Sequence, residues 1–162
     1  MRPLLILQLV ILVTVANGAP VIGKDILSGR YAFPLDAGLR LGDGQRLFGP
    51  SKTIRGILLS ILVTSFCALL IRLEWRIGFL VGSAAMAGDL LSSFVKRRLH
   101  LPAGARATGL DQVPESLFPL LACFSALSLT VMEIAAGVVI FFVGEMFLSH
   151  FLYKLRLRDR PY

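Results

Sequence analysis

Five apolar runs separated by two polar stretches make up most of the chain. The runs cover residues 3–22, 54–71, 77–95, 113–131 and 133–153. Roughly 20 apolar residues of helix cross the core of a bilayer, so each run predicts a transmembrane helix. We therefore expect an all-α fold, a single integral membrane domain over residues 1–162 built as a bundle of five transmembrane helices. The polar stretches 23–53 and 96–112 are expected to be loops that carry the functional site.

The positions of Lys and Arg predict how this bundle sits in the membrane. With the N-terminus outside and the C-terminus cytoplasmic, both loops and the basic residues after position 153 face the cytoplasm. This agrees with the positive-inside rule, so we expect a protein of the cell (inner) membrane whose site faces the cytoplasm. The first run also resembles a signal peptide, because Arg2 precedes it and small residues such as Ala19 end it. Cleavage there would export the cationic first loop against the same rule.

The composition excludes an ordinary soluble domain. Residues of the class AVILMFWYC make up 56% of the chain and charged residues 17%, whereas soluble domains are roughly 25% charged. The net charge of +7 favours anionic partners such as lipid headgroups, phosphates or a nucleotide. Nucleic acid is not expected, because the basic residues lie in short loops. Cys67 and Cys123 lie inside apolar runs and are expected to be core residues without a disulfide or a zinc site.

The end of the first loop carries residues suited to phosphate binding. Ser51, Lys52, Thr53 and Arg55 lie at the predicted N-terminus of the second helix. Free backbone N–H groups and the helix dipole favour an anion at that point. The alternative is that Ser51 or Thr53 only caps the helix and that the two cations only follow the positive-inside rule.

The third run contains a carboxylate, and intramembrane ionisable groups are functional by default. Asp89, Ser93, Lys96 and Arg97 share one helix face by their spacing. At 1.5 Å per residue, Asp89 should lie roughly 10 Å below the cytoplasmic end of the helix. We expect a polar pocket that opens inward and brings this carboxylate close to the basic residues. The alternative is a structural ion pair between Asp89 and Lys96 or an arginine.

Two further aspartates, Asp43 in the first loop and Asp111 before the fourth run, complete a candidate metal site with Asp89. Carboxylates among cations suit a magnesium-bound polyphosphate, because oxygen ligands hold the metal and cations hold the remaining phosphate oxygens. Asp111 could instead be a helix N-cap.

Three more residues are candidates for the cavity. Asn17 lies where Gly18 and Pro20 interrupt the first run, and its amide could face a polar cavity, although a plain helix end explains this segment equally well. Glu145 and His150 lie on the last run and could join the cavity, without a catalytic role being assigned to them.

A set of short motifs follows in order along the chain. They are Asn17-Gly18-Ala19-Pro20, Asp43-Gly44, Leu47-Phe48-Gly49-Pro50-Ser51-Lys52-Thr53-x-Arg55-Gly56, Gly88-Asp89, Ser93-x-x-Lys96-Arg97-Arg98 and Leu110-Asp111-Gln112-x-Pro114. Together they resemble the CDP-archaeol synthase family, which is related to the phosphatidate cytidylyltransferases. The resemblance implies a five-helix membrane enzyme that uses CTP and Mg²⁺ to convert a lipid phosphate into a CDP-lipid, releasing pyrophosphate.

The resemblance implies roles for Asp89, Lys96, Arg97 and Asp111, and then for Lys52 and Arg55; the hypothesis of nucleotidyl transfer assigns the other roles. The catalytic residues would be Asp89, Lys96, Arg97 and Asp111. The substrate-binding residues would be Asn17, Ser51, Lys52, Thr53, Arg55, Ser93, Arg98 and Gln112. The expected Mg²⁺ ligands are Asp89 and Asp111, with Asp43 as a third. Lys96, Arg97 and Arg98 are expected to neutralise the triphosphate, and Lys52 and Arg55 to hold the lipid phosphate or the leaving pyrophosphate.

The nature of the acceptor and two other function classes stay open. The longer bacterial-type signature, with a Lys-Asp pair, His-Gly-Gly and Asp-Arg-x-Asp, is absent, which favours an archaetidic-acid-like ether lipid phosphate over diacyl phosphatidate. A small transporter would use Asp89, Glu145 and His150 as a polar path across the membrane. A non-catalytic lipid-binding subunit would use only the basic loops. The oligomeric state is left open, a homodimer included.

Overall fold

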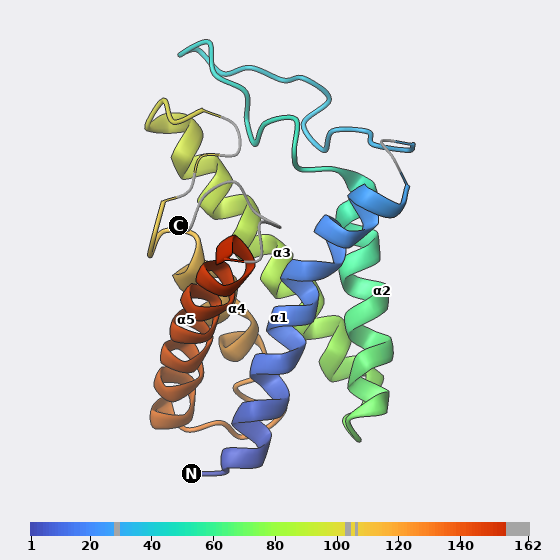
Figure 1. Ribbon diagram of the computed structural model, residues 1–162, viewed down its shortest axis with the longest axis vertical. Coiled ribbons are helices and arrows are strands. Elements are labelled where there is room, and N and C mark those ends of the chain that lie inside the picture. Colours follow the sequence, from blue (N-terminus) through green and yellow to red (C-terminus); the bar gives the residue numbers. More distant parts are fainter. Residues whose placement is uncertain (28–29, 103–104, 106, 155–162) are drawn as a thin grey trace.

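Five helices form a bundle in the computed structural model (Figure 1), which describes residues 1–27, 30–102, 105 and 107–154, with side chains up to position 149. The helices are α1 (Pro3–Ile26), α2 (Ile54–Leu70), α3 (Trp75–Arg98), α4 (Gln112–Ala122) and α5 (Val131–Lys154). Over the described part of the chain, extended pairing is limited to two isolated bridges, Pro34 with Thr53 and Arg40 with Arg46. The all-α prediction and the number and order of the helices are therefore confirmed.

The lengths of the helices differ from the prediction. Three of them, α1, α3 and α5, are long and apolar enough to cross a membrane, whereas α2 has only 17 residues. The helix predicted over 113–131 is wrong in length, because α4 ends at Ala122. The chain then turns, with Ser128 at a φ of +46°. The next helix starts with a capping box, in which the Thr130 hydroxyl accepts from the Glu133 N–H and the Glu133 carboxylate accepts from the Thr130 N–H.

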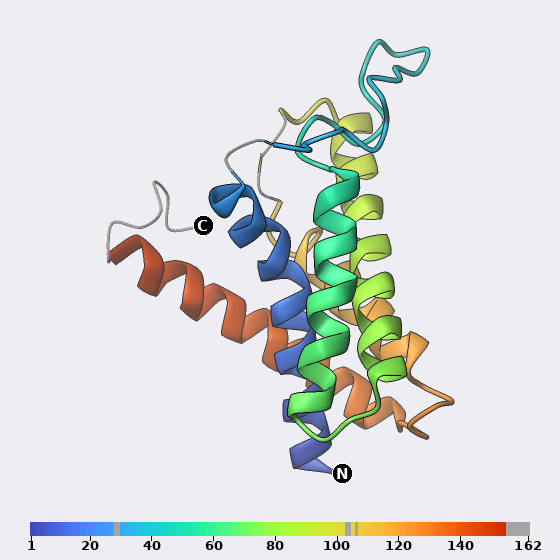
Figure 2. The same ribbon diagram turned by 90° about the vertical axis from the view of Figure 1, so that its right-hand side faces the viewer.

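The helices pack around α1 and α3. α3 contacts α1, α2 and α4, whereas α5 contacts α1 and α4, and Figure 2 shows α5 inclined to the other helices. The largest core cluster joins all five helices; it includes Leu9, Leu12, Val13, Ala68, Val81, Leu120 and Phe141. Figure 1 shows residues 30–53 of the first loop and the end of α3 at one end of the bundle and the N-terminus at the other. The orientation in the membrane stays a prediction.

The first helix continues through its predicted interruption. Pro20 has no N–H and cannot bond the carbonyl four residues earlier, which is that of Ala16. The buried Ser60 hydroxyl of α2 donates to this carbonyl at 2.8 Å. α2 comes close here because Gly56 packs against Pro20, where a Cβ would lie 3.3 Å from the Pro20 Cβ. The proline therefore joins α1 to α2 without ending α1.

Glycine lets α3 approach its neighbours. A Cβ on Gly88 would lie 2.3 Å from the Pro114 carbonyl oxygen of α4, and a Cβ on Gly78 would lie 2.5 Å from the Thr64 carbonyl oxygen of α2. Both contacts are with backbone atoms, so any side chain would push the helices apart. α3, which carries Asp89, is thus closely packed on two sides.

A polar clamp holds α1 and α5 together at the end opposite the loops. Arg2 pairs with Glu133 at 2.8 Å and donates to the carbonyls of Leu127 and Ser128 at 2.9 and 2.8 Å. The Glu133 side chain is only 2% exposed. The start of α5 is therefore fixed to the start of α1.

Candidate functional site

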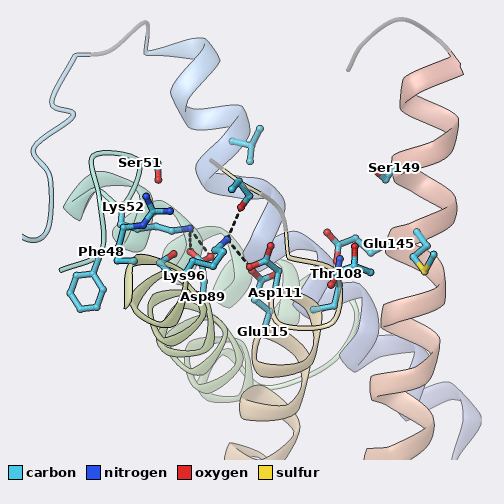
Figure 3. Close-up of a pocket in the computed structure, with 16 residues that line it drawn as sticks. Phe48, Ser51, Lys52, Asp89, Lys96, Thr108, Asp111, Glu115, Glu145 and Ser149 are labelled. Atoms are coloured by element: carbon cyan, nitrogen blue, oxygen red, sulfur yellow. Dashed lines mark hydrogen bonds and ion pairs between the residues drawn. The ribbon is translucent and has the colours of Figure 1, made fainter. Parts of the chain in front are cut away.

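Two adjoining cavities lie at the loop end of the bundle, and Figure 3 shows the residues that line the first of them. The first has a volume of about 340 Å³ and is lined mainly by α3, α4, α5 and the loops. The second, about 650 Å³, extends towards α1 and the start of α2. Both are lined by Val21, Ser51, Lys52, Asp89, Glu115 and Glu145. The shared residues form the boundary between the two spaces.

Asp89 of α3 pairs with a lysine from the other side of the cavity. Lys52, just before α2, places its Nζ 2.6 and 2.5 Å from the two carboxylate oxygens of Asp89. Both side chains are about one-fifth exposed. The sequence suggested Lys96 or an arginine as the partner, and the structure corrects this to Lys52, which is 37 residues away along the chain. The pair joins the turn before α2 to the middle of α3.

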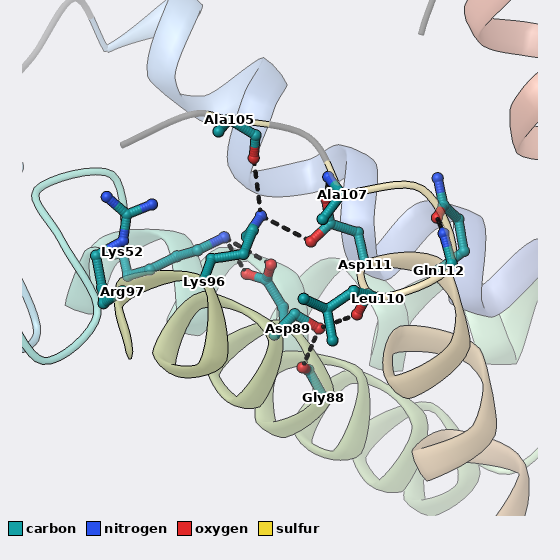
Figure 4. A network of polar contacts seen from close by, with 12 residues as sticks. Lys52, Gly88, Asp89, Lys96, Arg97, Ala105, Ala107, Leu110, Asp111 and Gln112 are labelled. Atoms are coloured by element: carbon teal, nitrogen blue, oxygen red, sulfur yellow. Dashed lines mark hydrogen bonds and ion pairs between the residues drawn. The ribbon is translucent and has the colours of Figure 1, made fainter. Parts of the chain in front are cut away.

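A second lysine–carboxylate pair lies beside the first (Figure 4). The Nζ of Lys96 is 2.7 Å from Oδ1 of Asp111 and donates to the Ala105 carbonyl at 3.1 Å. Oδ2 of Asp111 accepts from the Ala107 N–H at 3.0 Å. Asp111 occupies the N-cap position of α4, as the alternative expected, but its side chain makes no capping bond to the helix. Its carboxylate instead bonds to the backbone of the second loop and lines the cavity.

Ser92 holds the second loop against α3 and was missed by the sequence analysis. Its buried hydroxyl lies 2.8 Å from the carbonyl oxygen of Leu110, the residue before Asp111, and 3.0 Å from that of Gly88. The spacing of three residues from Asp89 gave a weak signal for a shared face. Ser93, which was chosen from the sequence, also lines the first cavity.

Glu115 of α4 is a further cavity residue that the sequence analysis did not select. It lines both cavities together with Asp89. From the sequence it is indistinguishable from a residue that complements the α4 dipole. The close contact between α3 and α4 at Gly88 brings it to the site.

Arg97 and Arg98 point to different places. Arg97 is 6% exposed, lines the first cavity and donates to the Pro102 carbonyl at 2.8 Å. Arg98 instead contacts the first loop, where it pairs with Asp43 at 2.9 Å, and it lies over the Phe94 ring at 5.3 Å. Asp43 and Arg98 line neither cavity. The structure therefore separates these two predicted site residues from the others.

The remaining predicted residues face the cavities. The first cavity is lined by Ser51, Lys52, Asp89, Ser93, Lys96, Arg97, Asp111 and Gln112. The second is lined by Asn17, Ser51, Lys52, Thr53, Arg55 and Asp89. Thr53 also caps α2, accepting from the Gly56 N–H at 3.1 Å, so capping and cavity lining coexist there. Arg55 donates to the Arg30 carbonyl. The side chain of His150 lies outside the described residues.

The donor set of the cavity fits a magnesium ion that arrives with a polyphosphate. Asp89, Asp111 and Glu115 present hard oxygen ligands to one space. Among the described residues, no group of three acidic, His or Cys side chains is close enough to hold a metal alone. Mg²⁺ is commonly held by one or two carboxylates together with substrate phosphates and water, which matches this arrangement.

Comparison with known proteins identifies relatives over nearly the whole chain. The family model CarS-like, CDP-archaeol synthase, matches residues 4–162. A CDP-archaeol synthase of Pyrobaculum calidifontis is 35% identical over 153 residues, 91% of each chain. That of Sulfurisphaera tokodaii is 34% identical over 154 residues, covering 91% of this chain and 89% of the relative. A solved structure, described as an intramembrane enzyme for archaeal membrane lipids biosynthesis, matches with a TM-score of 0.75 and 29% identity, covering 88% of this chain and 90% of that one.

Proposed function

The chain belongs to the CarS-like CDP-archaeol synthase family, and on that premise we propose that it is a Mg²⁺-dependent cytidylyltransferase. It condenses CTP with a membrane lipid phosphate to give a CDP-lipid and pyrophosphate, and the acceptor is an unsaturated archaetidic-acid-like ether lipid phosphate. The observation that carries this proposal is the pair of lysine–carboxylate contacts, Lys52 with Asp89 and Lys96 with Asp111, that face one cavity.

The reaction needs positioning more than acid–base chemistry. An oxygen of the lipid phosphate attacks the α-phosphorus of CTP in line, and the bond from that phosphorus to the oxygen bridging to the β-phosphate breaks as pyrophosphate leaves. The attacking phosphate is already anionic at neutral pH, so a strong general base is not required. Catalysis then comes from holding the two substrates and neutralising their charge.

The two cavities suggest how the substrates divide the site. Lys96 and Arg97 line only the first cavity and would bind the triphosphate of CTP. Arg55 lines only the second and would bind the lipid phosphate. Lys52 lines both, so it lies where the attacking and leaving groups meet. Bound Mg²⁺, held by Asp89 and Asp111, would supply further neutralisation of the phosphate charge.

The ion pairs of the site can be replaced by contacts with an anionic substrate and the cation that it brings. In the structure each of Lys52 and Lys96 faces a carboxylate. Burying an unpaired charge is costly, whereas a paired one costs much less. Phosphate oxygens can replace the carboxylates as partners of the lysines, and a divalent cation can replace the lysines as partner of the carboxylates. Each of these partly buried charges then keeps a counter-charge before and after binding.

The position of the cavities suits one soluble and one membrane-bound substrate. They lie at the loop end of the bundle, which the positive-inside rule predicts to be cytoplasmic. Val21 of α1 is 56% exposed and lines both cavities. CTP can therefore arrive past the loops, while the lipid tails stay among the helices in the bilayer. A transporter would need charged groups along a path across the membrane, whereas the cavity charges gather at one end.

The decisive experiment is pyrophosphate release from CTP by the purified protein in detergent with Mg²⁺, comparing an unsaturated ether lipid phosphate with diacyl phosphatidate. We expect lipid-dependent release, faster with the ether lipid. Faster release with the diacyl lipid would change the assigned acceptor, and no release with either lipid would overturn the proposal.

Substitutions at the carboxylates test the assignment of the site. Asp89→Asn and Asp111→Asn should abolish release while the protein stays folded, because each removes a charged group from the cavity. Asp43→Asn tests the structural correction, since Asp43 pairs with Arg98 away from both cavities, and it should retain most of the activity. Activity within a few fold of wild type for both Asp89→Asn and Asp111→Asn would contradict the assigned roles.

A further inference from the structure

A buried carboxylate lies in the first loop, outside both cavities. The Asp36 side chain is 0% exposed and accepts four hydrogen bonds. Oδ1 accepts from the Gly38 N–H at 3.1 Å and from the Arg46 guanidinium at 2.6 Å, and Oδ2 accepts from the N–H groups of Phe48 and Gly49 at 3.2 and 2.9 Å. Burial alone would raise the pKa of Asp36, but these donors outweigh it and hold the pKa well below its usual range. Asp36 is therefore an ionised, buried acceptor that joins four different residues of the loop.

The bonds to Asp36 fix the start of the turn that carries Lys52. Gly49 adopts a φ of +99°, a conformation that glycine favours, and its carbonyl accepts from the Lys52 N–H at 3.4 Å. The N–H of Gly49 is thus bonded to Asp36, and the carbonyl of Gly49 closes the turn by accepting from the Lys52 N–H.

The residues next to Asp36 fix the other end of the same turn. The Leu35 N–H donates to the Lys52 carbonyl at 2.8 Å, and Pro34 forms an isolated bridge with Thr53. The turn from Gly49 to Lys52 is therefore held at both ends by the segment 34–36. With its backbone fixed in this way, the Lys52 side chain enters the cavity and reaches Asp89.

We propose that Asp36 is a positioning residue for the reaction, which acts by folding the turn 49–52 so that Lys52 is presented to Asp89 and to the substrates. The role of Lys52 in the reaction rests on the proposed function. The geometry of the turn and of the Lys52–Asp89 contact does not depend on it. A lysine side chain has much conformational freedom to lose, so a fixed backbone determines how often its amine reaches the cavity. Without the Asp36 carboxylate, the N–H of Gly49 and the guanidinium of Arg46 both lose their buried acceptor.

Chemical labelling tests the geometry without any need for activity. The rate at which an amine-reactive reagent labels Lys52 is measured by mass spectrometry in wild type and Asp36→Asn. We expect Lys52 labelling to rise about tenfold, the ratio that corresponds to losing one hydrogen bond to a charged group. Lys96, which is held by Asp111 and the Ala105 carbonyl of the second loop, is the internal control, and its labelling should be unchanged. Asp25→Asn, which removes an exposed carboxylate at the end of α1, is the control variant. Equal labelling of Lys52 in all three proteins would overturn the inference.

A double-mutant cycle on kcat/KM tests the functional consequence. Asp36→Asn should lower kcat/KM about tenfold in the wild-type background and less than about twofold in the Lys52→Ala background, because coupled residues are not additive. An equal loss in both backgrounds would show a general structural role and overturn the inference. If Asp36→Asn does not fold, Arg46→Gln removes the ion pair and takes its place in both experiments. Absence of wild-type turnover would count against the proposed function alone, because the labelling result stands without it.

Discussion

The contact between α3 and α4 at Gly88 offers the sharpest test of how the site is assembled. In Gly88→Ala, the new Cβ would lie 2.3 Å from the carbonyl oxygen of Pro114, 2.6 Å from its carbonyl carbon and 2.9 Å from the N of Glu115. These are backbone atoms of a helix and cannot rotate away. Close-packed interiors transmit such strain, so α4 must retreat from α3 by roughly 1 Å to restore ordinary contact.

The expected effect on stability is moderate and the effect on activity is larger. Overpacking costs about 1–3 kcal/mol, and the better helix propensity of alanine returns about 1 kcal/mol of that. We therefore expect a net loss of stability of at most about 2 kcal/mol. Asp111 immediately precedes α4 and Glu115 lies on it, so both would move relative to Asp89. A misplacement of about 1 Å can cost about 100-fold in rate, which is the loss we expect in kcat/KM.

Thermal unfolding in detergent and pyrophosphate release measure the two effects separately. Gly144→Ala is the matched control, because Gly144 lies within α5 and a Cβ there meets nothing within 4 Å. We expect the control to keep the activity of the wild type and to melt at the same or a slightly higher temperature, because alanine favours the helix by about 1 kcal/mol. Gly88→Ala with unchanged melting temperature and activity would refute the argument that this glycine sets the spacing of the two helices. Reduced stability with full activity would refute only the link to the site.

Three further predictions concern other parts of the fold. Ser60→Ala should destabilise the protein by about 1–3 kcal/mol, because it leaves a buried carbonyl of α1 without a donor; adding Pro20→Ala should restore most of that loss in thermal unfolding, since alanine returns an N–H to the same carbonyl. Glu133→Gln should lower the melting temperature without changing KM for CTP, because the clamp lies at the far end from the cavities, and a raised KM would contradict this separation. The folded pKa of Asp36 is lowered, so its contribution is fully present above its unfolded pKa of about 3.9 and is lost as the pH falls towards the folded value. The difference in melting temperature between wild type and Asp36→Asn should therefore be constant from pH 7 to about pH 5 and shrink below about pH 4, and a difference that persists at low pH would contradict the ionised state.

The pattern of apolar and polar residues predicted those features that depend on residues close together in the sequence. The apolar runs gave the number and order of the helices, because burial in lipid requires continuous apolar sequence. The helical spacing from Asp89 to Lys96 correctly predicted that both face one cavity. The end of α4 was missed, although Thr130 and Glu133 show the three-residue spacing of a capping box. The end of α4 and the start of α5 are therefore encoded locally in the sequence.

Contacts between distant segments could not be predicted in the same way. The partner of Asp89 is Lys52, and this pairing depends on the fold of a loop that has little regular secondary structure. Asp43 and Arg98 carry the right chemistry for the site, but they pair with each other and hold the first loop to the end of α3. Nothing in their spacing distinguishes a residue that binds a substrate from one that holds a loop in place.

The clamp between Arg2 and Glu133 has a consequence for the order in which the chain folds during its synthesis. The two residues are 131 positions apart, and domains generally begin to fold from the N-terminal side as the ribosome proceeds. Throughout the synthesis of α1 to α4, Arg2 has no Glu133 to pair with, and the first cavity has no α5 side. The arrival of α5 supplies both at once. Completion of the bundle and completion of the candidate site are therefore one late event in the life of each molecule.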